Sequence, residues 1–229
     1  MKFIAVGVGP GDPDLITIRA LKVLEAADLV LVPVSGGERS SVAEAVVRAH
    51  LRDIETVPVV FPMTRDETAR DESLREQFEA LRPRWTRARS VVLPVIGDSA
   101  LYATAAYLCD VWRTLDPAFE LELVPGVSAH SIAASRAGRF LALGDAVLSI
   151  VPGTAERDLV ARTLSLCDSA ALYKPSALKD ALRSVVDSAG PWSRVLRVDR
   201  AGLPGERITL GDEALSPTTE YLSILLLWR

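Results

Sequence analysis

The chain has 229 residues, a net charge of −4 and a pI of about 5.3, with 49% hydrophobic and 24% charged residues. At ~150 residues per domain, this length predicts one large domain or two small ones. The composition is typical of a globular protein and excludes the disordered, collagenous and coiled-coil classes. Because the charge balance is mildly acidic, we expect no nucleic-acid partner. The longest apolar run, near Tyr221–Trp228, is far shorter than the ~20 residues that cross a bilayer, so no membrane partner is expected either.

The few cysteines and histidines argue against a disulfide framework and against a metal site. Cys109 and Cys167 stand far apart, as do His50 and His130. Neither pair has the close spacing of zinc ligands, so we expect no metal. The first residues, Met1–Gly7, predict a strand that begins at once instead of a secretory leader. The expected compartment is therefore the cytoplasm.

In the first half of the chain, short apolar runs alternate with amphipathic segments. Phe3–Val8 is rich in Val and Ile and predicts a strand that stops at Gly9–Pro13. Asp66–Arg89 predicts the longest helix, in which Pro83 predicts a kink or a break. In chain order we expect a strand Phe3–Val8, a helix Thr17–Ala27, a strand Leu29–Val34, a helix Ser41–His50, a strand Glu55–Phe61, a helix Asp66–Arg89, a strand Val91–Ile96 and a helix Leu101–Arg113.

A polar segment that contains a proline, Thr114–Phe119, follows, and we interpret it as a domain boundary. In the second half of the chain, apolar runs again alternate with amphipathic segments. The expected domains are residues 1–115 and 120–229. Strands that alternate with helices in both halves predict two α/β domains. The elements expected in the second half are strands at Leu121–Val124, Ala146–Val151, Ala170–Tyr173, Arg194–Val198 and Tyr221–Trp228, and helices at Ser128–Arg136, Ala155–Leu166 and Ser176–Ser188.

Three turns rich in Gly and Pro follow predicted strands: Gly9–Pro13, Gly97–Ser99 and Pro125–Ser128. Ligands of open α/β sheets bind at the carboxyl ends of strands, and glycine lets backbone approach a ligand closely. Each turn alone can equally be a plain tight turn or a helix cap, for which Asp98 and Ser128 are suited. Neither a GxGxxG nor a Gly-Lys-Ser/Thr sequence is present, so the first expectation is not a dinucleotide or a nucleoside triphosphate. Together the turns predict a ligand cleft between the two domains.

The segment VGVGPGDPDLITIRALKVLEAADLVLVP resembles the N-terminal signature of the tetrapyrrole (corrin/porphyrin) methylases. Further segments are similar to one branch of that family, the precorrin-2 C20-methyltransferases. These segments are VPVSGGERSSVAEAVV, FPMT, GDSALYATAAYL, PGVSAHSIAA and the ending YLSILLLWR. The resemblance covers nearly the whole chain. It implies two α/β domains unlike the usual Rossmann methyltransferase, use of S-adenosylmethionine, and a tetrapyrrole substrate. It also implies a homodimer, weakly supported by the apolar Leu141–Leu143.

The resemblance implies a set of cofactor-binding residues when the family's motifs are matched to this chain. These are Pro10, Ile96, Gly97, Asp98, Leu101, Tyr102, Ser128, Ala129, Tyr173, Lys174 and Ala201. One departure lies in the central turn, where Ser99 replaces the family's usual proline. We expect this change to loosen the loop and to leave Asp98 in place.

The implied reaction is methyl transfer from a sulfonium to a meso carbon of a reduced tetrapyrrole. It requires mainly alignment of the reactants and exclusion of water, with no metal and no protein nucleophile. The catalytic residues stay unknown, although Tyr102 and Asp98 lie in the right region for a base. Because the substrate carries many carboxylates, Arg39, Arg136 and Arg139 are candidate substrate contacts, with an ordinary solvated arginine as the alternative for each.

Three functions remain open. The first is C20 methylation of precorrin-2 or of its cobalt-bearing counterpart, which the Val-Pro-x-Ser segment favours. The second is methylation at another ring position or on uroporphyrinogen III. The third is a non-catalytic binding module, which the Gly97-Asp98 turn and the Ser128-Ala129 pair disfavour.

Overall fold

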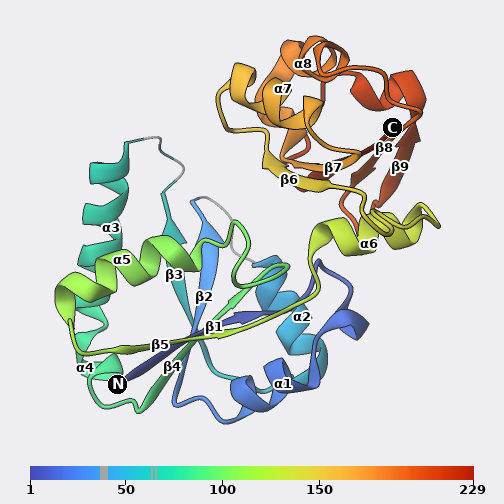
Figure 1. Ribbon diagram of the computed structural model, residues 1–229. Coiled ribbons are helices and arrows are strands. Elements are labelled where there is room, and N and C mark those ends of the chain that lie inside the picture. Colours follow the sequence, from blue (N-terminus) through green and yellow to red (C-terminus); the bar gives the residue numbers. More distant parts are fainter. Residues whose placement is uncertain (37–40, 63, 65) are drawn as a thin grey trace. The chain divides into compact units, whose positions relative to one another are not determined.

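A computed structural model describes residues 1–36, 41–62, 64 and 66–229 (Figure 1). The chain divides into two compact units, Met1–Ser128 and Ala129–Arg229, and each is built on a five-stranded sheet. Helices connect most of the strands in both units. The predicted α/β class, with two separate α/β layers, is therefore confirmed.

The first unit holds a parallel sheet with the strand order β3-β2-β4-β1-β5. Its strands are β1 (Lys2–Gly7), β2 (Leu29–Ser35), β3 (Thr56–Phe61), β4 (Ser90–Val95) and β5 (Glu120–Val124). Its helices are α1 (Ile18–Glu25), α2 (Val42–His50), α3 (Glu67–Ala80), α4 (Arg82–Trp85) and α5 (Ala105–Leu115). All five strands run in one direction, so their carboxyl ends share one edge of the sheet.

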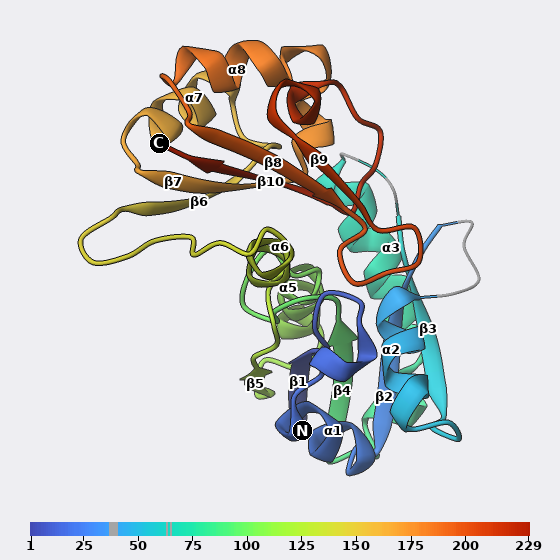
Figure 2. The same ribbon diagram turned by 90° about the vertical axis from the view of Figure 1, so that its right-hand side faces the viewer.

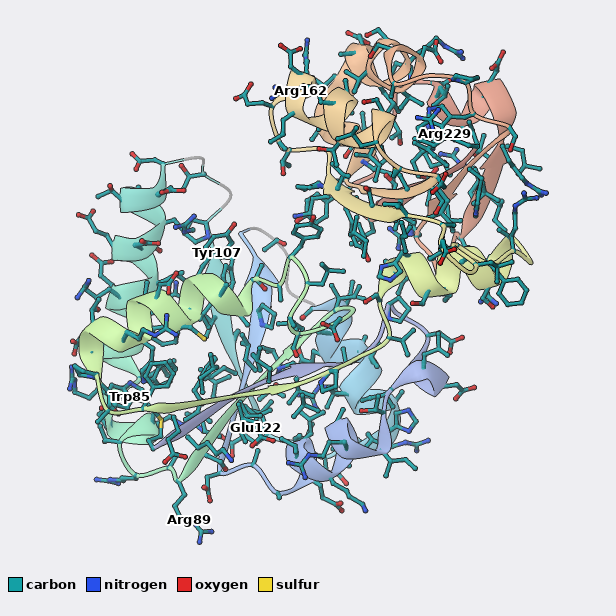
Figure 3. The ribbon with its side chains drawn as sticks, in the orientation of Figure 1. Trp85, Arg89, Tyr107, Glu122, Arg162 and Arg229 are labelled. Atoms are coloured by element: carbon teal, nitrogen blue, oxygen red, sulfur yellow. The ribbon has the colours of Figure 1, made fainter. Side chains whose placement is uncertain are left out.

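Helices cover both faces of this sheet, as Figure 1 shows. On one face, α1 and α2 pack over Ile4, Val6 and Val30. On the other, α3, α4 and α5 enclose an aromatic cluster in which the Trp112 ring lies 4.6 Å from the Phe78 ring and 5.3 Å from the Trp85 ring. Figure 3 labels Trp85 in this cluster. Burial on both faces explains why the inner strands β1, β2 and β4 are nearly continuous apolar runs.

The predicted domain boundary at Thr114–Phe119 differs from the division seen in the structure. This segment connects α5 to β5, and β5 pairs in parallel with β1 from Lys2↔Glu120 to Val6↔Val124. The strand expected at Leu121–Val124 therefore belongs to the first unit, which extends to Ser128. Composition alone does not distinguish a polar crossover loop from a linker between domains, because both are exposed and rich in polar residues.

The second unit has a mixed sheet with the order β6-β7-β10-β8-β9, in which β10 is antiparallel to both of its neighbours. Its strands are β6 (Leu148–Pro152), β7 (Ser169–Tyr173), β8 (Arg194–Asp199), β9 (Arg207–Leu210) and β10 (Ser223–Trp228). Its helices are α6 (Ala129–Arg136), α7 (Arg157–Ser165) and α8 (Leu182–Ser188). In Figure 2, α7 and α8 lie over one face of this sheet and α6 lies on the opposite face.

The elements differ locally from the sequence expectation. The predicted break at Pro83 is confirmed, because α3 ends at Ala80 and α4 begins at Arg82. The helix expected at Ser176–Ser188 starts instead as a 3-10 segment, Pro175–Ala181, that precedes α8. The short strand β9 was not predicted, because its four residues are too few for a period to stand out.

Within the residues that the structure describes, no helix is both long and apolar enough to cross a membrane.

Candidate functional site

In the first unit, the turns that follow β1, β4 and β5 meet at the carboxyl-end edge of the sheet. Gly97 donates its backbone N–H to Gly9 O at 2.7 Å, and Gly9 donates its own to Gly97 O at 3.2 Å. Asp98 joins the third turn, because its Oδ2 accepts the Gly126 N–H at 2.9 Å. Its Oδ1 accepts the Ala100 N–H at 2.8 Å, within its own turn. Pro10, Ile96, Gly97 and Asp98 are thus brought to one place.

Glycine is required where the turns touch. A Cβ on Gly126 would overlap Gly97 O, and a Cβ on Gly7 would lie 2.7 Å from both Gly126 N and Gly97 O. Any side chain there would force the turns apart. At Gly97, by contrast, a Cβ would have no described atom within 4 Å. The turn therefore presents bare backbone on that side, which suits close approach of a ligand.

Ser99 ties the central turn to the neighbouring strand. Its hydroxyl donates to Val124 O at 2.8 Å, and the residue is only 5% exposed. The expectation of a looser loop is therefore not supported, because the hydroxyl adds a buried hydrogen bond that a proline ring cannot make.

Leu101 and Tyr102 follow the central turn before α5 begins. Tyr102 is 44% exposed and adopts a left-handed backbone conformation with φ of 51°. Partial burial raises the pKa of its phenol above the usual value, because the phenolate is poorly solvated there. A phenol with a raised pKa is a weaker candidate for a base at neutral pH than an ordinary one.

Left-handed backbone occurs at two of the predicted cofactor residues that are not glycine. In the described part of the chain, the non-glycine residues with positive φ are Tyr102, Lys174, Lys179 and Arg200. Tyr102 and Lys174 belong to the predicted set, and Arg200 precedes Ala201. Such residues cost about 1–3 kcal/mol each and tend to cluster at functional sites, so their distribution independently marks these turns.

In the second unit, Tyr173 ends β7 and contacts the first turn of α6. Its hydroxyl oxygen lies 2.8 Å from His130 Nδ1 and accepts the His130 backbone N–H at 3.3 Å. Ala129, which follows Ser128 in the chain, is the first residue of α6. The structure therefore brings the predicted residues Ala129 and Tyr173 close together through His130, which sequence reasoning did not single out.

Lys174 and Ala201 lie at the same edge of the second sheet. Lys174 donates its backbone N–H to Ser223 O at 3.2 Å, and Arg200 donates to Leu222 O at 2.6 Å. Both segments thus flank the start of β10. Ala201 is 7% exposed, and the Lys174 ammonium lies 5.0 Å from the centre of the Tyr221 ring.

Glu206 organises the loop after β8 and was also missed from sequence. Its Oε2 accepts the Gly202 N–H at 2.6 Å, and Arg136 Nε donates to its Oε1 at 2.9 Å. The guanidinium of Arg136 is therefore already paired with a carboxylate. Arg139, the second predicted substrate contact, stacks 5.5 Å from the Trp228 ring centre. The third, Arg39, lies outside the described residues.

A hollow of about 560 Å³ lies at the opposite, amino-end edge of the first sheet. Its described lining includes Asp28, His50, Arg52, Glu55 and Arg84, and no predicted cofactor residue is among them. Arg84 pairs with Glu55 there at 2.5 Å. Ligands of parallel sheets bind at the carboxyl ends of strands, so we assign the candidate site to the turns and not to this hollow.

Comparison with known proteins identifies a family for this chain. The model of the tetrapyrrole (corrin/porphyrin) methylases matches residues 2–215. The chain is 29% identical to a precorrin-2 C(20)-methyltransferase from Sinorhizobium sp, covering 100% of this chain and 96% of the relative. It is 30% identical to a cobalt-precorrin-2 C(20)-methyltransferase from Salmonella typhimurium, covering 90% and 86%. A uroporphyrin-III C-methyl transferase from Thermus thermophilus, complexed with S-adenosylhomocysteine, has the same fold, with a TM-score of 0.70, 20% identity, and coverage of 100% and 98%.

Proposed function

Because the chain belongs to the tetrapyrrole (corrin/porphyrin) methylase family, we propose that it is an S-adenosylmethionine-dependent methyltransferase acting at C20 of precorrin-2 or of cobalt-precorrin-2. This proposal rests on the similarity of the chain to two relatives that are named for that reaction. The chain is 29% and 30% identical to them, and each alignment covers 90% or more of this chain.

The turns of the first unit fit a nucleoside cofactor. Gly97 presents uncovered backbone, and Asp98 holds the neighbouring turn in place through Gly126. We propose that Pro10, Ile96, Gly97, Asp98, Leu101, Tyr102 and Ser128 contact the cofactor from this unit. The proposed contacts of the second unit are Ala129, Tyr173, Lys174 and Ala201. The left-handed backbone at Tyr102 and Lys174 supports these assignments.

When bound, the cofactor would supply an electrophilic methyl group. A carbon–carbon bond at C20 would form as the sulfur–methyl bond breaks, which would leave S-adenosylhomocysteine, and the C20 proton would then be lost. The residues of this chain act by alignment. The three linked turns form a rigid edge, because backbone and Asp98 hydrogen bonds join them, and a rigid edge holds reactants at a fixed distance. Residues that exclude water from the reacting carbon add to the rate.

The many carboxylates of a tetrapyrrole substrate require local positive charge. We propose Arg39, Arg136 and Arg139 for this role. The ion pair between Arg136 and Glu206 lowers the charge that Arg136 can offer, whereas Arg139 stacks on an aromatic ring. Arg→Ala substitution at all three positions, one at a time, tests the assignment. Unchanged substrate affinity in every variant would remove it.

The decisive experiment is incubation of the purified chain with S-adenosylmethionine and precorrin-2, with and without cobalt, followed by mass spectrometry and NMR location of the new methyl. A methyl at C20 supports the proposal. A methyl at another ring position, or on uroporphyrinogen III, indicates a sibling methylase. Lack of any binding of S-adenosylhomocysteine by calorimetry indicates a non-catalytic module.

We further propose that the protein works in the cytoplasm as a homodimer. Phe140 and Leu143, next to the apolar Leu141, are 75% and 69% exposed in the single chain, which supports a covered surface in an assembly. Light scattering at micromolar concentration tests this point, and a monomer mass would reject it.

A further inference from the structure

We propose that His130 is a positioning residue. The Tyr173 hydroxyl holds its imidazole in the tautomer that is protonated on Nε2, and this pair fixes the start of α6 against the end of β7. The inference rests on the proposed function, because Ala129, Tyr173 and Lys174 are proposed cofactor contacts. The contacts between His130 and Tyr173 lie within the second unit.

The Tyr173 hydroxyl reaches two atoms of the same residue. It lies 3.3 Å from the His130 backbone nitrogen and 2.8 Å from His130 Nδ1, although the two residues are 43 positions apart. The two rings meet edge to face, at 72°, with centroids 6.0 Å apart. A single hydroxyl thus sets both the backbone and the side-chain direction of His130.

The two contacts point to one tautomer. The backbone N–H can only donate, so the Tyr173 oxygen accepts it. The hydroxyl hydrogen then points to another acceptor, and Nδ1 at the shorter distance is an acceptor only when it carries no proton. Neutral imidazole with a bare Nδ1 carries its proton on Nε2. The arrangement in which Nδ1–H donates to the same oxygen is the alternative that the experiment must exclude.

The Tyr173 hydroxyl links the end of β7 to the start of α6, and each of these elements also has contacts of its own. The Tyr173 carbonyl accepts the Gly153 N–H at 2.7 Å, and a Cβ on Gly153 would lie 2.6 Å from Lys174 O, so the end of β7 is held firmly by the end of β6. In α6, Ile132 and Ala133 are buried. His130 supplies one of the helix's first amides, which have no partner within the helix.

We expect the contact between His130 and Tyr173 to affect the affinity for the cofactor more than the rate of methyl transfer. Without the contact, the segment that begins at Ala129 and the Tyr173–Lys174 segment would lose a shared restraint. The cofactor would then have to order them on binding, which weakens affinity. Removal of a residue that acts in this way raises the KM for the cofactor and leaves kcat nearly unchanged.

The test combines a tautomer measurement with variants at both residues. Long-range proton–nitrogen NMR spectra of the ¹⁵N-labelled chain report which imidazole nitrogen is protonated. The chain has two histidines, so an H50Q variant assigns the remaining signals to His130. His130→Leu removes the Nδ1 acceptor, His130→Asn keeps an acceptor near that position, and Tyr173→Phe removes the hydroxyl. Thermal unfolding of each variant confirms that it folds.

We expect a protonated Nε2 and a bare Nδ1 in the wild type, and a measurable rise in the Nδ1-protonated form in Tyr173→Phe. We expect His130→Leu to raise the dissociation constant of S-adenosylhomocysteine about tenfold, about 1.4 kcal/mol, with kcat changed less than about threefold. His130→Asn should recover most of the affinity. A proton on Nδ1, or unchanged affinity in His130→Leu, would overturn the proposal. If the wild type binds no S-adenosylhomocysteine, the proposed function fails, and the tautomer spectrum alone then decides whether the Tyr173–His130 bond exists.

Discussion

Asp98 accepts the backbone N–H of Gly126 at 2.9 Å, across 28 positions of sequence. The carboxylate thereby joins the turn after β4 to the turn after β5. The other carboxylate oxygen stabilises the turn of Asp98 itself through Ala100. One side chain therefore determines both the shape of the central turn and its distance from the next.

Replacing Asp98 by Ala should lower both stability and ligand affinity. Two backbone amides lose their acceptor, so we expect unfolding in urea to show a loss of about 1–3 kcal/mol. Asp98→Asn, which keeps one oxygen, should lose less. Asp116→Ala is the matched control, because Asp116 Oδ1 accepts the Ala118 N–H within another turn, and its effect should be smaller, with ligand affinity unchanged. Equal stability of the Asp98→Ala and wild-type proteins would contradict the assigned role.

Gly126→Ala should separate the turns. Its Cβ would meet backbone atoms of Gly97 and Gly7, which cannot move aside as a flexible side chain could. We expect a loss of about 1–3 kcal/mol in urea unfolding and weaker binding of S-adenosylhomocysteine by calorimetry. Gly36→Ala is the control, because its Cβ would have Phe61 O at 4.0 Å as its nearest described neighbour. A Gly126→Ala variant that matches this control would show that the contact is not needed.

Asp28 should contribute stability that depends on pH. Its Oδ2 accepts the Ser90 N–H at 2.9 Å, the Arg89 N–H at 3.0 Å and the Ser90 hydroxyl. The Ser90 backbone bond is the largest cause that holds the pKa of Asp28 below its usual value. A carboxyl with a lowered folded-state pKa stabilises the fold above its unfolded pKa of about 3.9, and this contribution disappears as the pH falls through the folded-state value.

We therefore expect Asp28→Asn to melt below the wild type at pH 7, and the gap between the two melting temperatures to narrow as the pH falls from about 4 through the lowered folded-state pKa of Asp28. Calorimetric melting temperatures across this range check the expectation. A gap that stays constant with pH would show that the charge of Asp28 contributes nothing.

Cys109 should be inert in the folded protein. It is 4% exposed, and burial raises the pKa of its thiol to about 11, so almost no thiolate forms near neutrality. We expect a Cys167→Ser variant to resist alkylation at pH 8 until it unfolds in urea, as followed by mass spectrometry. Fast labelling of the native protein would mean that α5 opens far more readily than its buried packing indicates.

The local pattern of the sequence was sufficient to predict much of the fold and to select the turns of the candidate site. Val- and Ile-rich runs such as Phe3–Val8 predicted most strands, Pro83 predicted the break after α3, and the turns around Gly9, Gly97 and Gly126 were recognised as candidate ligand-binding segments. These features follow from residue type and spacing over a few positions, which the sequence contains directly.

Only the tertiary structure decided which of these segments meet. Because β5 pairs with β1, the first unit extends past Val124. The buried Ser99 hydroxyl donates a hydrogen bond to Val124 O, and the Tyr173 hydroxyl contacts His130. Each of these contacts joins residues that are far apart in the chain. The order of strands in a sheet determines which distant residues become neighbours. That order arises from the packing of the whole unit, and a local hydrophobic period in the sequence does not specify it.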